Sequence, residues 1–186
     1  MKTKRIVLTG APATGKTTLC QALEGAGYHV FHEQAREIIQ RSLQTGSNIL
    51  PWKDLLGFTE EVWELRMQQY DNALLETINF YDRTVMDSYA YLIKDKVPTR
   101  EQWEKDMDEK RFDQIFLLPV WPEIHAQDTE RMETLEECYE VEKFMRAAYE
   151  QKGYSLIDVP FGTVEERIAF IAVSYTHLTL PTTSRV

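Results

Sequence analysis

The sequence contains little cysteine, with only Cys20 and Cys138 among its 186 residues. Two cysteines cannot supply the disulfide framework of a small secreted domain, and their separation matches no zinc-binding pattern. The four histidines also lack metal-ligand spacing. Cys20 lies within a predicted helix, where a small buried side chain is a simpler expectation than a reactive thiol. The sequence therefore argues against a disulfide scaffold and gives no sign of a zinc centre.

Positive charge is scarce as well. The 21 Lys and Arg residues are outnumbered by 30 Asp and Glu residues, which gives a formal net charge of -9 and a pI of about 5.0. A general nucleic-acid binder needs a basic face to neutralise phosphates, so we expect no nucleic-acid partner. A local pocket for one small polyphosphate remains compatible with this charge, because a few lysines and arginines are enough to form it.

Long apolar runs are missing too. The first apolar run ends at Gly10 and is too short for the apolar region of a signal peptide. No stretch of about 18 apolar residues occurs that would cross a membrane. We therefore expect a cytoplasmic protein without a membrane span. The sequence does not indicate its oligomeric state.

Strands and helices are predicted to alternate along the chain. Apolar and β-branched runs predict strands, and apolar residues at helical spacing predict helices. Thr59 and the Thr163–Glu166 pair are helix-capping signals. Segments 98–111 and 119–129 are expected to be a charged connector and an irregular stretch. The predicted strands cover 5–9, 28–31, 77–81, 114–118 and 154–159, and the predicted helices cover 15–24, 32–43, 58–74, 85–94, 130–152 and 163–173.

This alternation predicts an α/β protein with three layers, in which a parallel five-stranded sheet carries helices on both faces. Hydrophobic residues make up 43% and charged residues 27% of the chain, as in soluble globular proteins. The length fits one domain. Ligands of such sheets bind at the carboxyl ends of the strands, so the loops that follow the strands are where site residues are expected.

The last thirteen residues, 174–186, differ in composition from the rest. They include four threonines and no acidic residue. They resemble translated sequencing-adapter read-through, and a disordered native tail is the alternative. We therefore expect one nucleotide-binding, kinase-like domain over residues 1–173 and a tail without function over residues 174–186.

The loop after the first predicted strand fits the pattern G-x4-G-K-[ST], which is typical of a P-loop. Its glycines allow backbone N–H groups to cradle phosphate oxygens at the start of a helix. Lys16 is expected to reach the β- and γ-phosphates, Thr17 to ligate Mg²⁺ and Thr18 to bond the α-phosphate. The alternative, a glycine-rich turn without a ligand, is disfavoured by the strand before it and the helix after it. The predicted ATP-binding residues are Gly10, Ala11, Pro12, Ala13, Thr14, Gly15, Lys16, Thr17 and Thr18.

Charged residues follow the second and third predicted strands. Glu33 is placed to accept the proton of a substrate hydroxyl, and Arg36 lies one turn further on. The alternative is a simple ion pair on a helix surface. Asp82, followed by Arg83, ends an apolar strand and is placed to hold a magnesium-bound water. Its alternative is a carboxylate that caps the next helix.

A third pair, Asp128 and Arg131, opens the predicted helix after the fourth strand. An arginine at this point can fold over a transferring phosphoryl group, as lid residues do, whereas a solvated helix end is the alternative. The D-x-x-G pattern at 54–57 has no strand before it, and no N-K-x-D guanine motif occurs. A switch-type GTPase is therefore not expected, although ATP and GTP are not otherwise distinguished.

With these residues in place, the chain resembles the small P-loop AAA-type ATPase family that includes the ribosylnicotinamide kinase domain of the bacterial NAD-biosynthesis regulator. The resemblance spans Arg5 to about Ala172 and implies the strand order 2-3-1-4-5 with a kinase-like lid after strand four. It also implies that five residues face the substrate, with Glu33 as the base: Glu33, Asp82, Arg83, Asp87 and Arg131. Its motifs are RIVLTGAPATGKTTL, EQAREII, FYDRTVMDSYAYL, RFDQIFLLP and the succession DTER, GYSLIDVP and VEERIAFI.

Two functions are therefore considered. The first is a kinase that moves the γ-phosphoryl group of ATP to a hydroxyl of a nucleoside-like, ribosylnicotinamide-type small molecule. The second is an NTP-binding regulatory or adaptor ATPase that hydrolyses slowly and has no small-molecule acceptor. Glu33 and the lid arginine favour the kinase. Its expected catalytic residues are Lys16, Glu33, Asp82 and Arg131, its substrate contacts Glu33, Arg36, Arg83, Asp87 and Asp128, and its Mg²⁺ ligands Thr17 and Asp82.

Overall fold

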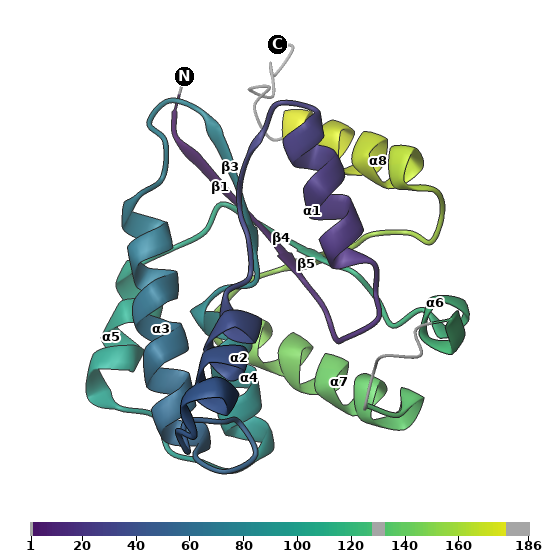
Figure 1. Cartoon of the computed structure of the whole chain (residues 1–186). Coiled ribbons are helices and arrows are strands. Elements are labelled where there is room, and N and C mark those ends of the chain that lie inside the picture. The colour runs from purple at the N-terminus through teal and green to yellow at the C-terminus, as the bar shows by residue number, and fades with distance from the viewer. Residues whose placement is uncertain (1, 128–132, 178–186) are drawn as a thin grey trace.

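The computed structural model describes residues 2–127 and 133–177, which form a three-layer α/β sandwich (Figure 1). The strands form one parallel sheet in the order β2-β3-β1-β4-β5, as expected from the sequence. Because all four strand pairs are parallel, each connection crosses over the sheet and carries at least one helix. The strands are β1 (Lys4–Thr9), β2 (His29–Phe31), β3 (Ile78–Asp82), β4 (Gln114–Leu117) and β5 (Leu156–Asp158).

Two apolar cores lie on the two faces of this sheet. In β1, Ile6 and Leu8 point to one core and Val7 to the other, because successive side chains of a strand face opposite sides. The first core is covered by α1 (Lys16–Gly25) and α8 (Val164–His177). The second core is covered by α3 (Leu55–Asp71), α4 (Val85–Lys94), α5 (Glu101–Glu109) and α7 (Leu135–Gln151). Helices α2 (Ala35–Thr45) and α6 (Pro122–Gln127) lie near the carboxyl ends of the strands (Figure 1).

The predicted charged connector over 98–111 contains a helix. Helix α5 is strongly charged, but Trp103 and Met107 are spaced four residues apart and bury against the second core. Two apolar residues in nine do not establish helical periodicity in the sequence. The expected irregular stretch over 119–129 likewise contains α6.

Helix boundaries also differ from the expected ones. Helix α3 begins at Leu55, where the Asp54 carboxylate accepts a hydrogen bond from Gly57 N over 2.9 Å, so the D-x-x-G pattern is a helix cap. Thr59, expected at that cap, is buried inside the helix. Helix α7 begins at Leu135 behind a Thr134–Glu137 capping box rather than near residue 130.

Helix α8 extends to His177, four residues past its expected end. The capping box expected at its start is present, with Thr163 N 2.8 Å from Glu166 Oε2 and Glu166 N 3.2 Å from Thr163 Oγ1. Near its end, the Tyr175 hydroxyl lies 2.6 Å from the Tyr28 hydroxyl. In the described part of the chain, no helix is both long and apolar enough to cross a membrane.

Candidate functional site

The loop between β1 and α1 has the backbone geometry of a phosphate cradle. Gly10 has φ 145° and Gly15 has φ 78°, a region that favours glycine. A Cβ atom at Gly10 would collide with the carbonyl oxygen of Leu118, so this turn requires glycine for space as well. Helix α1 starts directly after Gly15 and directs its N-terminal N–H groups toward the loop.

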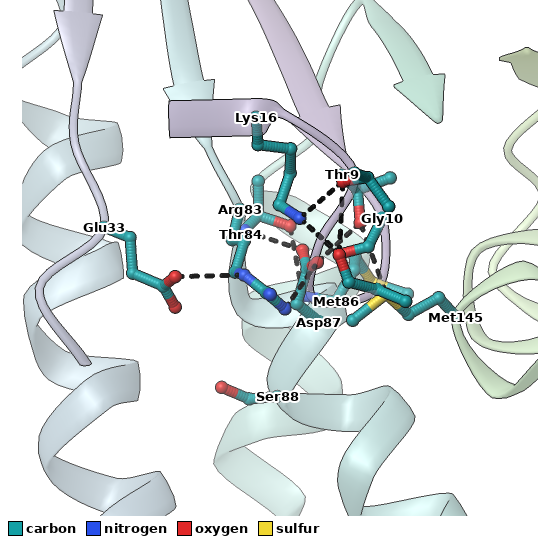
Figure 2. Close-up of polar contacts among 12 residues, drawn as sticks. Thr9, Gly10, Lys16, Glu33, Arg83, Thr84, Met86, Asp87, Ser88 and Met145 are labelled. Atoms are coloured by element: carbon teal, nitrogen blue, oxygen red, sulfur yellow. Dashed lines mark hydrogen bonds and ion pairs between the residues drawn. The ribbon is translucent and has the colours of Figure 1, made fainter. Parts of the chain in front are cut away.

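The Lys16 ammonium group is folded into this loop (Figure 2). Its Nζ donates to the carbonyl oxygens of Gly10 and Ala11 over 2.7 Å each and lies 3.1 Å from Thr14 Oγ1. Burial, together with the positive charge of Arg83, lowers the pKa of Lys16 to about 7. A buried ammonium that has only carbonyl and hydroxyl partners is well suited to receive phosphate oxygens.

Asp82 ends β3 beside the P-loop and is buried. Its Oδ1 has no hydrogen-bond partner within the described residues, and burial raises the pKa of the carboxyl group. Asp82 does not cap the next helix, because Thr84 and Asp87 form the capping box of α4. A buried carboxylate with a free oxygen, in a cavity that Thr17 also lines, fits a magnesium-bound water.

A small cavity of about 160 Å³ lies over the P-loop. It brings together most of the residues that the sequence predicts for the site, since Thr17, Glu33, Arg36, Asp82 and Arg83 line it beside the loop itself. No group of three or more His, Cys, Asp or Glu side chains that could hold a metal occurs in residues 2–127 and 133–177. A magnesium ion here would therefore depend on phosphate and water oxygens for most of its ligands.

Glu33 is held between two arginines. Its Oε2 lies 3.1 Å from Arg83 Nε and its Oε1 lies 3.4 Å from Arg66 Nη2. Burial alone would raise the pKa of Glu33, but the charges of Arg83 and Arg66, helped by Lys16 and Arg36, hold it below its usual value. Glu33 thus forms close ion pairs with Arg83, between β3 and α4, and with Arg66 of α3. The charge of Arg36 attracts it at longer range. Glu33 lies in the loop before α2 rather than on a helix surface.

A second, larger cavity of about 330 Å³ lies beside the first. Glu33, Arg36 and Arg83 line both cavities, so they form the boundary between them. The remainder of the larger cavity is mostly apolar and is built from α2, α3, α4 and the segment before α3. Its apolar wall includes Ile39, Trp52, Leu55, Phe58, Val62 and Tyr91. A cavity with an apolar wall and a charged end next to the P-loop suits an organic molecule that meets a phosphoryl group at that end.

Asp87, expected to face the substrate, is fully buried and supports the site from beneath (Figure 2). Its carboxylate accepts hydrogen bonds from Thr9 Oγ1 over 2.5 Å, Thr84 N over 2.8 Å and the Tyr149 hydroxyl over 2.7 Å. Arg83 Nη1 lies 3.9 Å away. Its direct contact with substrate stays a prediction.

The lid pair Asp128 and Arg131 lies outside the described residues. Their predicted roles stay predictions as well. The segment that follows is anchored by His125, whose Nε2 lies 2.8 Å from the Glu133 carbonyl oxygen. Glu133 lines the larger cavity, so the chain after Asp128 and Arg131 returns to the site.

Two arginines of the site were missed by sequence reasoning. Arg66 of α3 donates to the Thr84 carbonyl oxygen and to Ser88 Oγ over 2.7 Å each, and also pairs with Glu33. The one feature of the sequence that could have identified Arg66 is its position four residues after Val62, on the apolar face of a predicted helix. Arg167 of α8 is 3% exposed and donates to the Thr14 carbonyl oxygen of the P-loop over 3.1 Å. Only its place in the VEER sequence, one turn after a capping threonine, distinguishes it.

A family model described as an AAA domain matches residues 5–167. The chain belongs to this AAA-domain family. Its matched segment begins in β1, contains the P-loop and ends at Arg167 in α8. Among curated proteins, none matches the chain.

Solved structures with a similar fold include two kinases and the NadR protein. A deoxyadenosine kinase from M. mycoides, with products dCMP and a flexible dCDP bound, has a TM-score of 0.65 and 15% identity, and covers 94% of this chain and 100% of its own. NadR protein in complex with NR has a TM-score of 0.66 and 18% identity over 98% of this chain, which spans 54% of that one. Shikimate kinase from Acinetobacter baumannii with shikimate has a TM-score of 0.60 and 17% identity, covering 96% of each chain. At these identities the likeness shows the kinase-like P-loop fold.

Proposed function

We propose that this protein is a phosphotransferase that moves the γ-phosphoryl group of ATP to a hydroxyl group of a nucleoside-like, ribosylnicotinamide-type molecule. The observation that carries the proposal is that Glu33 and Arg83 line both the P-loop cavity and the apolar cavity. A carboxylate at that boundary can accept a proton from a hydroxyl in one cavity while a phosphoryl group lies in the other. A cytoplasmic location, expected from the sequence, fits such a reaction.

In the proposed reaction, the acceptor oxygen attacks the γ-phosphorus as the bond to the β–γ bridging oxygen breaks and ADP leaves. Glu33 takes the hydroxyl proton, because Arg83 and Arg66 keep its carboxyl group ionised. Lys16 and Arg83 would stabilise the charge on the transferring group. Thr17 and, through a water, Asp82 would hold Mg²⁺, which neutralises phosphate charge when bound. Arg131 and Asp128 are proposed to close over the site as part of a lid.

The acceptor class follows from the larger cavity. Its aromatic and aliphatic wall suits the flat ring of a nucleoside, and its charged end suits a ribose hydroxyl. Two of the similar structures are named as a deoxyadenosine kinase and as NadR in complex with NR, which supports a nucleoside-like acceptor over other alcohols. The shikimate kinase in the same group shows that the fold also occurs with another acceptor.

The nucleoside end of ATP is proposed to lie against Trp121 and Phe161. Their rings stack with centroids 5.1 Å apart and an interplanar angle of 28°. Trp121 follows β4 and Phe161 follows β5, so the pair lies at the carboxyl edge of the sheet, where Arg167 of α8 lies over the Trp121 ring. Phe161 is 54% exposed, which leaves ring surface on which a base can stack.

A thermal-shift screen of nucleosides and vitamins, with an ATP analogue and Mg²⁺ present, tests the proposal. An acceptor that binds the folded protein raises the melting temperature by mass action, and it should then take radiolabelled phosphate from ATP. A Leu55→Trp variant, which fills the larger cavity, should lose the acceptor shift and keep the nucleotide shift. If no acceptor shifts the melting temperature or takes phosphate although ATP binds, the slowly hydrolysing regulatory ATPase is the better description.

A further inference from the structure

Arg167 is a buried cation against the outer side of the P-loop. The Thr163–Glu166 capping box fixes the start of α8, so Arg167 lies in its first turn. Its side chain is 3% exposed, and its Nη2 donates to the Thr14 carbonyl oxygen over 3.1 Å. A Cβ atom added to Gly15 would come within 2.9 Å of Nη1, so the guanidinium group also lies directly against Gly15.

No carboxylate pairs with this arginine in the part of the chain that the structure describes. Its Nε has no hydrogen-bond partner there either, and burial lowers the pKa of the guanidinium group. Its Cζ atom lies over the Trp121 ring, 5.6 Å from the ring centroid. Burying a cation without a counter-ion is unfavourable, so its place next to a polyphosphate-binding loop calls for a role connected with that loop.

The geometry of a peptide unit supplies that role. The Thr14 carbonyl and the Gly15 N–H belong to one planar trans peptide, so they point in opposite directions. A donor fixed on the carbonyl oxygen outside the loop therefore holds the N–H toward the inside. The positive charge of the donor also polarises the peptide and strengthens that N–H as a hydrogen-bond donor.

We propose that Arg167 is a positioning residue of the phosphate site, which holds the Thr14–Gly15 peptide so that the Gly15 N–H points at the nucleotide phosphates. This inference rests on nucleotide binding at the P-loop and is independent of the acceptor. Backbone N–H groups of such loops contact the α- and β-phosphates. The effect should therefore be large for ATP and ADP, whose β-phosphate the cradle encloses, and small for AMP.

Calorimetric titration of ATP, ADP and AMP with Mg²⁺ tests this on the wild type and two variants. Arg167→Met keeps the apolar stem but removes the donor and the charge, and Arg167→Lys keeps the charge. We expect Arg167→Met to weaken ATP and ADP about tenfold or more, the usual scale for a charge-assisted hydrogen bond, and to change AMP less than about twofold. Arg167→Lys should recover part of the loss. Arg111→Met, which removes an exposed arginine stacked on Tyr154, is the matched control and should bind as wild type.

Two results would overturn the inference. One is that Arg167→Met binds ATP and ADP as tightly as wild type. The other is an equal loss for ATP, ADP and AMP, which would assign Arg167 to packing against Trp121. If Arg167→Met does not fold, the Gly15 amide resonance of ADP-bound Arg167→Lys decides, because a displaced peptide shifts it and an unchanged resonance contradicts the proposal. Failure of nucleotide binding itself is distinguishable, since the wild type would then bind no better than Lys16→Ala.

Discussion

Glu33 Oε2 lies 3.1 Å from Arg83 Nε, at the boundary between the two cavities. The contact joins the loop after β2 to the residue that follows β3. Arg83 has φ 71°, a left-handed conformation that costs a non-glycine residue on the order of 1 kcal/mol. The backbone at this position is therefore strained while its side chain meets Glu33, as is common at functional sites.

The pairing of Glu33 with Arg66 predicts a pH dependence. Arg83 and Arg66 hold the pKa of Glu33 below its usual value. The acid limb of kcat/KM should therefore lie below the pH at which a free glutamate titrates. Arg66→Gln removes one positive charge and should move that limb to higher pH. Arg100→Gln, which breaks an exposed pair with Glu60, should leave the limb in place. An unmoved limb in Arg66→Gln would show that Arg66 does not set the charge of Glu33.

The same pairing contributes to stability. A carboxyl group with a depressed pKa in the folded state binds fewer protons than in the unfolded state. Its contribution is present above the unfolded pKa and is lost as pH falls through the folded pKa. Arg66→Gln should therefore reduce the loss of stability on acidification below about pH 4, the range in which unfolded glutamate titrates. Urea unfolding at several pH values measures this.

Lys16 predicts proton uptake on nucleotide binding. With a pKa of about 7, much of its ammonium group is deprotonated at pH 8 in the nucleotide-free protein. Phosphate oxygens favour the charged form, so ATP binding should take up a fraction of a proton at pH 8 and much less at pH 6. Calorimetry in two buffers of different ionisation enthalpy gives this number. Lys16→Ala should abolish the uptake, and an equal uptake in that variant would assign it to another group.

Asp82 is expected to lower the stability of the nucleotide-free protein and to support the Mg²⁺ dependence of nucleotide binding. Burial raises the pKa of its carboxyl group, so the ionised form is destabilising in the empty site. Asp82→Asn should raise the melting temperature of the nucleotide-free protein by a few degrees, the scale of about 1 kcal/mol in a chain of this length. It should also weaken the dependence of nucleotide binding on Mg²⁺. The exposed Asp95→Asn is the control, and a lower melting temperature in Asp82→Asn would contradict this account.

The C-terminal boundary is tested by two truncations. The Tyr175 hydroxyl forms a hydrogen bond with the Tyr28 hydroxyl, and its ring meets the Phe80 ring edge-on with centroids 6.5 Å apart. A chain ending at Val173 loses these contacts and should melt a few degrees lower than the full chain. A chain ending at His177 should melt as the full chain does. Equal melting temperatures for both truncations would place the boundary at residue 173, as the sequence alone suggests.

The sequence predicted those features that are local in the chain. The P-loop is one continuous motif, and the strands are short apolar runs, so both were found with nearly correct bounds. The sequence indicates Glu33 and Asp82 because each lies at the carboxyl end of a predicted strand, and the sheet order brings them to one cavity.

The rest depends on contacts between distant segments. Arg66 meets Glu33 across 33 positions and Arg167 meets Thr14 across 153, and no spacing rule connects such pairs. The resemblance alone implied that Asp87 faces the substrate, and its buried hydrogen bond from the Tyr149 hydroxyl joins segments 62 positions apart. Helix α5 was missed because its apolar face is only two side chains wide.

The most direct test of the account is phosphoryl transfer by Glu33→Gln, compared with ATP affinity in the same variant. Glutamine keeps the size and most hydrogen bonds of Glu33 but removes its basicity. The account predicts that transfer to the acceptor falls by about 10² to 10⁴, the usual scale for loss of a general base, while ATP affinity stays within about twofold. Transfer at the wild-type rate would contradict it and would reduce Glu33 to an ion-pair partner of Arg83 and Arg66.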